Sequence, residues 1–99
     1  MTMVNCIRFV PKDGCEETVF ELVAKQYKTL DGALEKRIVN LGDGEYASVI
    51  VWKSVEDFLE VLNREVRLID VLRPYVKPYD DGEDFHAFSG PAVDLSMYE

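Results

Sequence analysis

The sequence contains few of the residues from which metal centres are built. It has two cysteines, Cys6 and Cys15, and a single histidine, His86. The cysteines are not at a metal-binding CxxC spacing, and a zinc site needs more thiolate or imidazole ligands than these. No glycine-rich phosphate-binding loop is present either. The sequence therefore predicts no metal and no cofactor.

Basic residues are also scarce. Eleven Lys and Arg face nineteen Asp and Glu, which gives a net charge of −8. Nucleic acid and anionic lipid attract the opposite charge, so neither is expected as a partner. No apolar run approaches the roughly 18 residues that span a bilayer. A secretory leader is not recognisable at the N-terminus, so we expect a cytoplasmic protein with reduced cysteines, although a Cys6–Cys15 disulfide is geometrically possible.

The chain is long enough for one hydrophobic core. Its 99 residues are 47% hydrophobic and 30% charged, a composition typical of a globular domain rather than a disordered segment. We expect a single domain over residues 1–99.

Hydrophobic periodicity predicts four strands and two helices. Asp13, three residues before Glu16, and Ser54, three before Asp57, have the capping-box spacing that begins a helix. Asp80–Asp84 is expected to be a solvated acidic loop. The expected elements are strands over about 3–10, 34–41, 45–52 and 85–89, and helices over about 15–30 and 55–72.

This order is that of the ferredoxin-like fold, an α+β βαββαβ arrangement with an antiparallel sheet. Helices cover one face of such a sheet, and apolar residues on both faces of the first strand predict that a second copy covers the other. The period-two pattern after Gly90 suggests that residues 91–99 form an extra edge strand or an arm on the partner subunit. A second apolar strip at Val61, Leu68 and Val71 indicates a subunit contact or a lined pocket.

Several short segments resemble the antibiotic biosynthesis monooxygenase family of dimeric α+β barrels. They are Asn5–Phe9 in the first strand, Asp13-Gly14 before the first helix, the hairpin arm from Leu34, and Val51-Trp52-Lys53-Ser54 followed by Phe58. In the last of these, a Trp anchors a strand end and a serine caps the helix that follows.

The resemblance implies a homodimer and a small hydrophobic or aromatic ligand. Members of the family include cofactor-independent monooxygenases of quinols and polyketide anthrones, and haem-degrading enzymes. The haem-degrading branch needs a Trp and a His that align with Val61 and Val71 here, so haem degradation is disfavoured. The resemblance implies a cofactor-independent monooxygenase acting on a quinol-like or polyketide-like aromatic in an apolar pocket.

Two residues are the candidates for catalysis. His86 is the only histidine and could act as a general base near neutral pH, or else it is an ordinary surface histidine. Asn5 lies in an otherwise apolar strand, so its amide either orients a substrate oxygen or bonds to the backbone.

The candidate pocket residues are Trp52, Arg37 and Tyr46. Trp52 would line the cavity, or belong to the core or an interface. Arg37, if it points inward, would stabilise a phenolate or enolate, whereas on the surface it would pair with a carboxylate. Tyr46 would supply a hydroxyl, although packing also explains its position.

The sequence leaves two kinds of function open. In the first, the chain is an enzyme whose apolar pocket holds an electron-rich aromatic while the substrate carbanion reduces O₂. In the second, it is a non-catalytic dimeric module of the same fold that binds a ligand or a protein partner, with Asn5 and His86 satisfied structurally.

Overall fold

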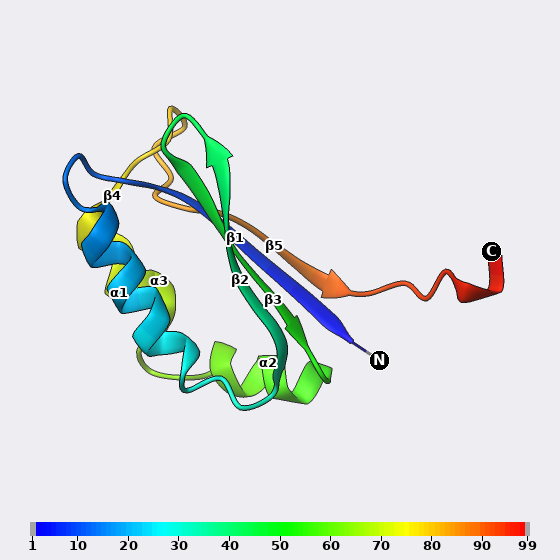
Figure 1. The fold of residues 1–99 in the computed structure, drawn as a ribbon. Helices are drawn as coiled ribbons and strands as arrows, with labels where there is room; N and C mark the ends of the chain where they lie inside the picture. Colours follow the sequence, from blue (N-terminus) through cyan, green and yellow to red (C-terminus); the bar gives the residue numbers. More distant parts are fainter. Residues whose placement is uncertain (1, 99) are drawn as a thin grey trace.

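A computed structural model describes residues 2–98 of the chain, so residues 1 and 99 of the expected domain lie outside it. A five-stranded antiparallel sheet packs against three helices (Figure 1). The strands are β1 (Met3–Pro11), β2 (Ala33–Gly42), β3 (Glu45–Trp52), β4 (Val76–Lys77) and β5 (His86–Pro91), and the helices are α1 (Glu16–Tyr27), α2 (Val55–Leu62) and α3 (Leu68–Leu72).

The sheet order confirms the predicted ferredoxin-like topology. β1 is central, with β3 along one side and β5 along the other, and β2 forms a hairpin with β3. The short β4 pairs only with Val10 and Pro11 at the end of β1. All helices lie on one side of the sheet, as Figure 1 shows. The molecule is therefore a two-layer α+β domain with one sheet face free of helices.

Alternation along the strands gives the sheet two distinct faces. The core lies on the helical face and has two parts. Around Phe9, which is fully buried, pack Val19, Val23, Leu68, Leu72 and Val76, and a second cluster contains Met3, Leu30, Ile50, Trp52 and Phe58. The cavity described below opens between the sheet and the helices beside this second cluster.

The two predicted helix caps had different outcomes. Ser54 caps α2 as predicted, because its hydroxyl oxygen accepts a hydrogen bond from the backbone N–H of Asp57. The prediction for Asp13 was wrong. Its carboxylate lies 2.8 Å from Lys77 Nζ, and α1 begins without a side-chain cap. An ion pair from a neighbouring element has replaced the local cap.

The long second helix was also predicted wrongly, because it is divided into α2 and α3. Residues 63–67 leave the helical path, and Asp70 Oδ2 accepts the backbone N–H of Arg67 at the start of α3. Within this break, Arg64 donates hydrogen bonds to Glu60 of α2 and to Thr29 after α1. Because α3 begins as a separate helix, Leu68 and Leu72 enter the core. Tertiary contacts have overridden a continuous apolar pattern.

The segment after β5 leaves the body of the domain. Ala92 N–H still donates to Thr2 O, and beyond it the chain projects outward as Figure 1 shows. It contains no strand, only a turn of 3₁₀ helix at Ser96–Tyr98. Its side chains are exposed, Met97 by 88%. The predicted extra strand is therefore absent from residues 92–98 of the single chain.

The close contact between Gly32 and α2 leads to the first prediction. A Cβ added at Gly32 would lie 2.4 Å from Cγ of Asp57, and that side chain is held in place because Ser54 Oγ donates to its Oδ2. We expect Gly32→Ala to lower the free energy of unfolding by about 1–3 kcal/mol, as overpacking does. Urea denaturation followed by circular dichroism measures this.

The matched control is Gly90→Ala, whose added methyl meets no atom within 4 Å. It should change the free energy of unfolding by less than about 0.5 kcal/mol. Equal urea midpoints for wild type and Gly32→Ala would show that the loop moves away from α2 at no cost.

Candidate functional site

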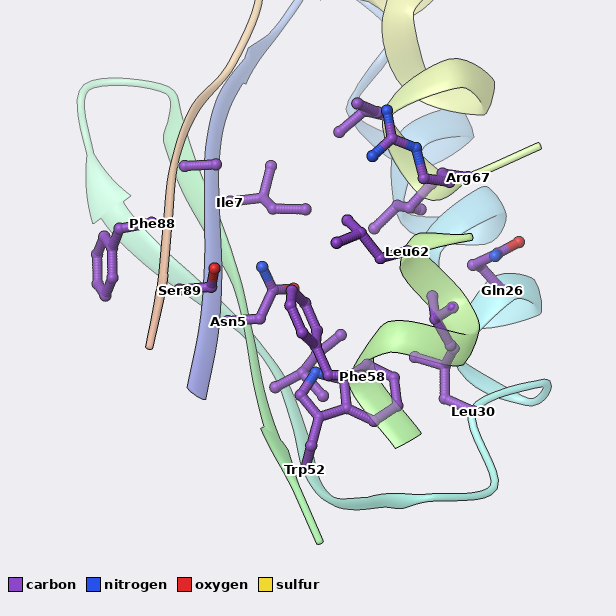
Figure 2. A pocket seen from close by; sticks show the side chains of 15 residues that line it. Asn5, Ile7, Gln26, Leu30, Trp52, Phe58, Leu62, Arg67, Phe88 and Ser89 are labelled. Atoms are coloured by element: carbon purple, nitrogen blue, oxygen red, sulfur yellow. The ribbon is translucent and has the colours of Figure 1, made fainter. Parts of the chain in front are cut away.

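A cavity of about 250 Å³ lies between the helical face of the sheet and all three helices. Figure 2 shows its lining from both layers. The sheet contributes Asn5, Ile7, Ile50, Trp52, Ala87 and Ser89, together with Phe88, whose side chain points away from the cavity in Figure 2, and the helical side contributes Gln26, Leu30, Phe58, Val61, Leu62, Arg67, Leu68 and Ile69. Most of these side chains are apolar, as expected for a small-molecule site, with a few polar groups among them.

Asn5 is the polar group at the middle of the sheet wall. It faces Ile50 of β3 and Ser89 of β5 in register, on the same face as the buried Met3 and Phe9. Figure 2 shows its amide directed into the cavity. Among residues 2–98 its side chain has no hydrogen-bond partner. The amide therefore offers both a donor and an acceptor to a bound molecule.

Trp52 lies at the end of β3 and is only 1% exposed. Its ring packs against Phe58, with the ring centroids 6.1 Å apart. The indole Nε1–H is buried and has no hydrogen-bond partner within residues 2–98. A buried polar group without a partner costs free energy, and Trp52 is among the residues that line the cavity.

Within residues 2–98, Arg67 is the only charged residue that lines the cavity. It begins α3, is half-buried, and makes no ion pair within residues 2–98. In Figure 2 it lies on the helical wall, across the cavity from Asn5. The polar lining is completed by Gln26 of α1 and Ser89 of β5.

His86 does not line this cavity. In β5 it is paired with Arg8 of β1, on the sheet face opposite to that of Asn5. An Arg8 guanidinium nitrogen donates to His86 Nδ1 over 2.9 Å, so this ring nitrogen carries no proton. The proton of the neutral ring is then on Nε2, which donates to Asp81 Oδ2 over 2.8 Å. His86 connects a strand to the acidic loop rather than facing the apolar cavity.

Tyr79 belongs to the same cluster. Its ring stacks on that of His86 with the centroids 3.9 Å apart, and its hydroxyl donates to Glu45 Oε2 over 2.6 Å. Burial, with the hydrogen bond and charge of Glu45, raises the pKa of Tyr79 to about 12. The hydroxyl therefore stays protonated and acts as a structural donor.

The acidic loop is largely exposed, as predicted, and two of its carboxylates also contact basic side chains. Asp84 pairs with Arg73 over 2.8 Å, and Asp81 pairs with His86. The backbone N–H of Glu83 and the hydrogen bond from His86 lower the pKa of Asp81 below its ordinary 3.8. The carboxylates of Asp81 and Asp84 therefore connect the loop to β5 and to Arg73 after α3.

This lowered pKa gives a prediction for Asp81→Asn. A carboxyl whose pKa is depressed by folding stabilises the fold above its unfolded pKa, and that contribution is lost as the pH falls through the folded pKa. We expect a small loss of stability for Asp81→Asn at pH 7, which decreases as the pH falls below about 3.8 and vanishes below the lower pKa of the folded state. Urea titrations across this range measure it. Asp80→Asn is the control, and an equal loss for Asp81→Asn at pH 7 and pH 3 would contradict the prediction.

The structure brings only two of the five candidate residues into the cavity, Asn5 and Trp52. Arg37 is in register with Val49 on the opposite face and pairs with Glu35 over 2.9 Å. Tyr46 is on the helical face but at the far end of β3, where its hydroxyl donates to Glu16 and its ring packs near Phe9.

Sequence reasoning missed Arg67, Gln26 and Ser89 as lining residues. The strip of Val61 and Leu68 was a signal for a lined pocket, and both residues line the cavity. No sequence signal indicated Arg67, because a continuous helix was predicted over the break between α2 and α3 in which Arg67 lies. Within residues 2–98, no three His, Cys, Asp or Glu side chains gather as metal ligands would.

No protein-family model and no curated protein matches this sequence. Solved structures do match. A protein from Chloroflexus aurantiacus J-10-fl, named as a candidate antibiotic biosynthesis monooxygenase, is 13% identical with a TM-score of 0.71, and 95% of each chain is covered. SnoaB, a cofactor-independent oxygenase from Streptomyces nogalater, is 17% identical with a TM-score of 0.69, and 94% of each chain is covered.

A third structure, Rv0793 from Mycobacterium tuberculosis, has a TM-score of 0.73 at 12% identity over 97% of this chain and 99% of its own. In residues 2–98, none of the helices has the length and apolar character needed to cross a membrane. The resemblance seen in the sequence is thus confirmed for the whole fold: the chain has the ferredoxin-like fold of the antibiotic biosynthesis monooxygenase structures.

Proposed function

We propose that this protein is a cofactor-independent monooxygenase that oxidises a small, electron-rich hydroxylated aromatic in the cavity. The observation that carries the proposal is the pairing of Asn5 and Trp52. Both residues line a mostly apolar cavity, and within residues 2–98 neither the Asn5 amide nor the buried Trp52 Nε1–H has a hydrogen-bond partner. The shared fold with the oxygenase SnoaB supports the same reaction class.

The chemistry follows from the lining. A phenolic substrate must lose its proton to become reactive toward O₂, and the N–H groups of Asn5 and Trp52 stabilise the oxyanion that results. None of the cavity-lining residues within 2–98 is an Asp, Glu or His, so the proton passes to water. The cavity then acts by lowering the pKa of the bound phenol, and the rate should rise with pH.

The overall reaction balances without an external reductant. The phenolate passes electrons from its para carbon to O₂, a carbon–oxygen bond forms there, and the resulting peroxide loses water. A phenol and O₂ thus give a para-quinone and one water, with one oxygen atom kept in the product. The apolar lining holds the ring and shields the intermediate from solvent.

The cavity size narrows the substrate. Its volume of about 250 Å³ falls just below the roughly 300–1,000 Å³ of pockets that hold drug-sized ligands. A one- or two-ring aromatic therefore suits it better than a polycyclic polyketide. Haem remains disfavoured, because Val61 lines the cavity where the haem-degrading branch needs an aromatic residue.

Oxygen uptake tests the proposal. With 1-naphthol or 2-methyl-1-naphthol, both of which have a free para carbon, the protein should consume O₂ in chelator-treated buffer faster than the autoxidation blank. Under ¹⁸O₂, 1-naphthol should give 1,4-naphthoquinone with one labelled oxygen. Rates equal to the blank with both substrates and with an anthrone would reject the enzyme. Binding of these aromatics without oxidation would instead identify a ligand-binding module. That alternative agrees with a lining that has no Asp, Glu or His within residues 2–98.

We also propose that the protein is a cytoplasmic homodimer joined through the sheet face that no helix covers. This face carries Val4, Val49 and Val51, half-buried, and Phe88 and Val39, which are 66% and 40% exposed. An apolar patch of this kind is typical of a protein interface. Cys6 and Cys15 are free thiols, which fit a reducing compartment.

A further inference from the structure

The charge of the cavity differs from the charge of the rest of the molecule. The protein has a net charge of −8, yet no carboxylate lines the cavity within residues 2–98 and the only charged group in its lining is the Arg67 guanidinium. Surface charges are screened within about 8–10 Å by salt, whereas a charge beside a low-dielectric cavity is screened less. The cavity is therefore locally suited to an anion although the protein as a whole repels one.

Arg67 is also available to a ligand. The other four arginines of this chain, Arg8, Arg37, Arg64 and Arg73, each contact a carboxylate. Among residues 2–98 the Arg67 guanidinium has no such partner. Its backbone is fixed at the start of α3, where the backbone N–H of Arg67 donates to Asp70. A half-buried guanidinium beside apolar walls is a bidentate site for a carboxylate.

We infer that the substrate is an aromatic hydroxy acid, with a ring carboxylate bound by Arg67 on the helical wall. The inference rests on the proposed function, and it names the substrate class for the same cavity. Arg67 and Asn5 lie on opposite walls (Figure 2), so an aromatic ring fits between the carboxylate bound at one and the phenolic oxygen bound at the other. Arg67 is then a specificity residue for hydroxy acids over neutral phenols.

A pair of probes that differ only in the carboxylate tests this. Calorimetric titration of the whole protein at pH 7 should give a dissociation constant for 5-hydroxy-1-naphthoate, whose hydroxyl and carboxylate lie on opposite sides of the ring system, about 10–100-fold lower than that for 1-naphthol, the usual gain from a charged hydrogen bond. In Arg67→Gln this ratio should fall below about threefold while 1-naphthol binds as before. Added NaCl should weaken only the carboxylate probe.

The control is Arg73→Gln, which removes the same charge outside the cavity, where Arg73 pairs with Asp84. It should leave the ratio unchanged. The inference is overturned if the ratio of the two dissociation constants is the same in wild type and Arg67→Gln. It is also overturned if Arg67→Gln weakens the binding of both probes equally, or if neither probe binds. Oxygen uptake distinguishes the two proposals. If 1-naphthol is oxidised but the ratio of the two dissociation constants is the same in wild type and Arg67→Gln, only the inference of a hydroxy acid substrate is refuted. If the carboxylate probe binds selectively but no substrate is oxidised, only the proposed oxygenase activity is refuted.

Discussion

Asn5→Leu should lower the rate of phenol oxidation about 10²–10³-fold, the usual cost of losing one preorganised donor to a developing oxyanion. Leucine is close in size to asparagine and preserves the apolar walls around the site. Because the Asn5 amide has no partner within residues 2–98, its loss leaves no other polar group unsatisfied. We therefore expect the free energy of unfolding to stay equal or rise, while the rate falls.

The measurement is oxygen uptake with 1-naphthol as a function of substrate concentration. A loss in kcat with little change in KM is expected, because an oxyanion contact is stronger in the transition state than in the ground state. Asn63→Leu is the control, since Asn63 ends α2 on the exposed surface and outside the cavity lining. Equal rates for Asn5→Leu and wild type would remove Asn5 from the mechanism.

Much of the fold was predictable from local chemistry. The β-branched run Val49-Ile50-Val51 and the glycine-flanked turn at Asp43 specify the β2–β3 hairpin, which forms as expected. The order of elements then limits the topology to the split βαβ arrangement. The boundary between α2 and α3 was not predictable, because it depends on contacts of Arg64 with Thr29, 35 residues away in sequence.

The candidate site was less predictable than the fold, for a reason of register. A strand residue faces one side or the other according to the parity of its position, and periodicity is ambiguous in β1, where both faces are apolar. The sequence therefore did not show whether Asn5 and His86 face the same side of the sheet. The β1–β5 register pairs Asn5 with Ser89 and Arg8 with His86. This places the two candidate catalytic residues on opposite faces of one sheet.

Val49→Glu should convert the proposed homodimer into monomers. Val49 lies on the uncovered sheet face, in register with Cys6 of β1 and Arg37 of β2. The neighbouring Arg37 already pairs with Glu35, so the new carboxylate competes for that partner. In a two-fold interface each substitution occurs twice, and a buried charge left unpaired costs about 3–5 kcal/mol. The dimer dissociation constant should therefore rise at least ~10⁴-fold. Sedimentation equilibrium at micromolar protein should give twice 11.3 kDa for wild type and 11.3 kDa for the variant.

A matched valine separates this effect from a general effect of added charge. Val66, 59% exposed between α2 and α3, lies away from the sheet, so Val66→Glu should remain a dimer. Because the cavity lies on the opposite face and is lined within one chain, monomeric Val49→Glu should still bind 1-naphthol with a dissociation constant within about threefold of wild type. A dimeric Val49→Glu would place the interface elsewhere, and loss of ligand binding in the monomer would show that the partner subunit completes the cavity.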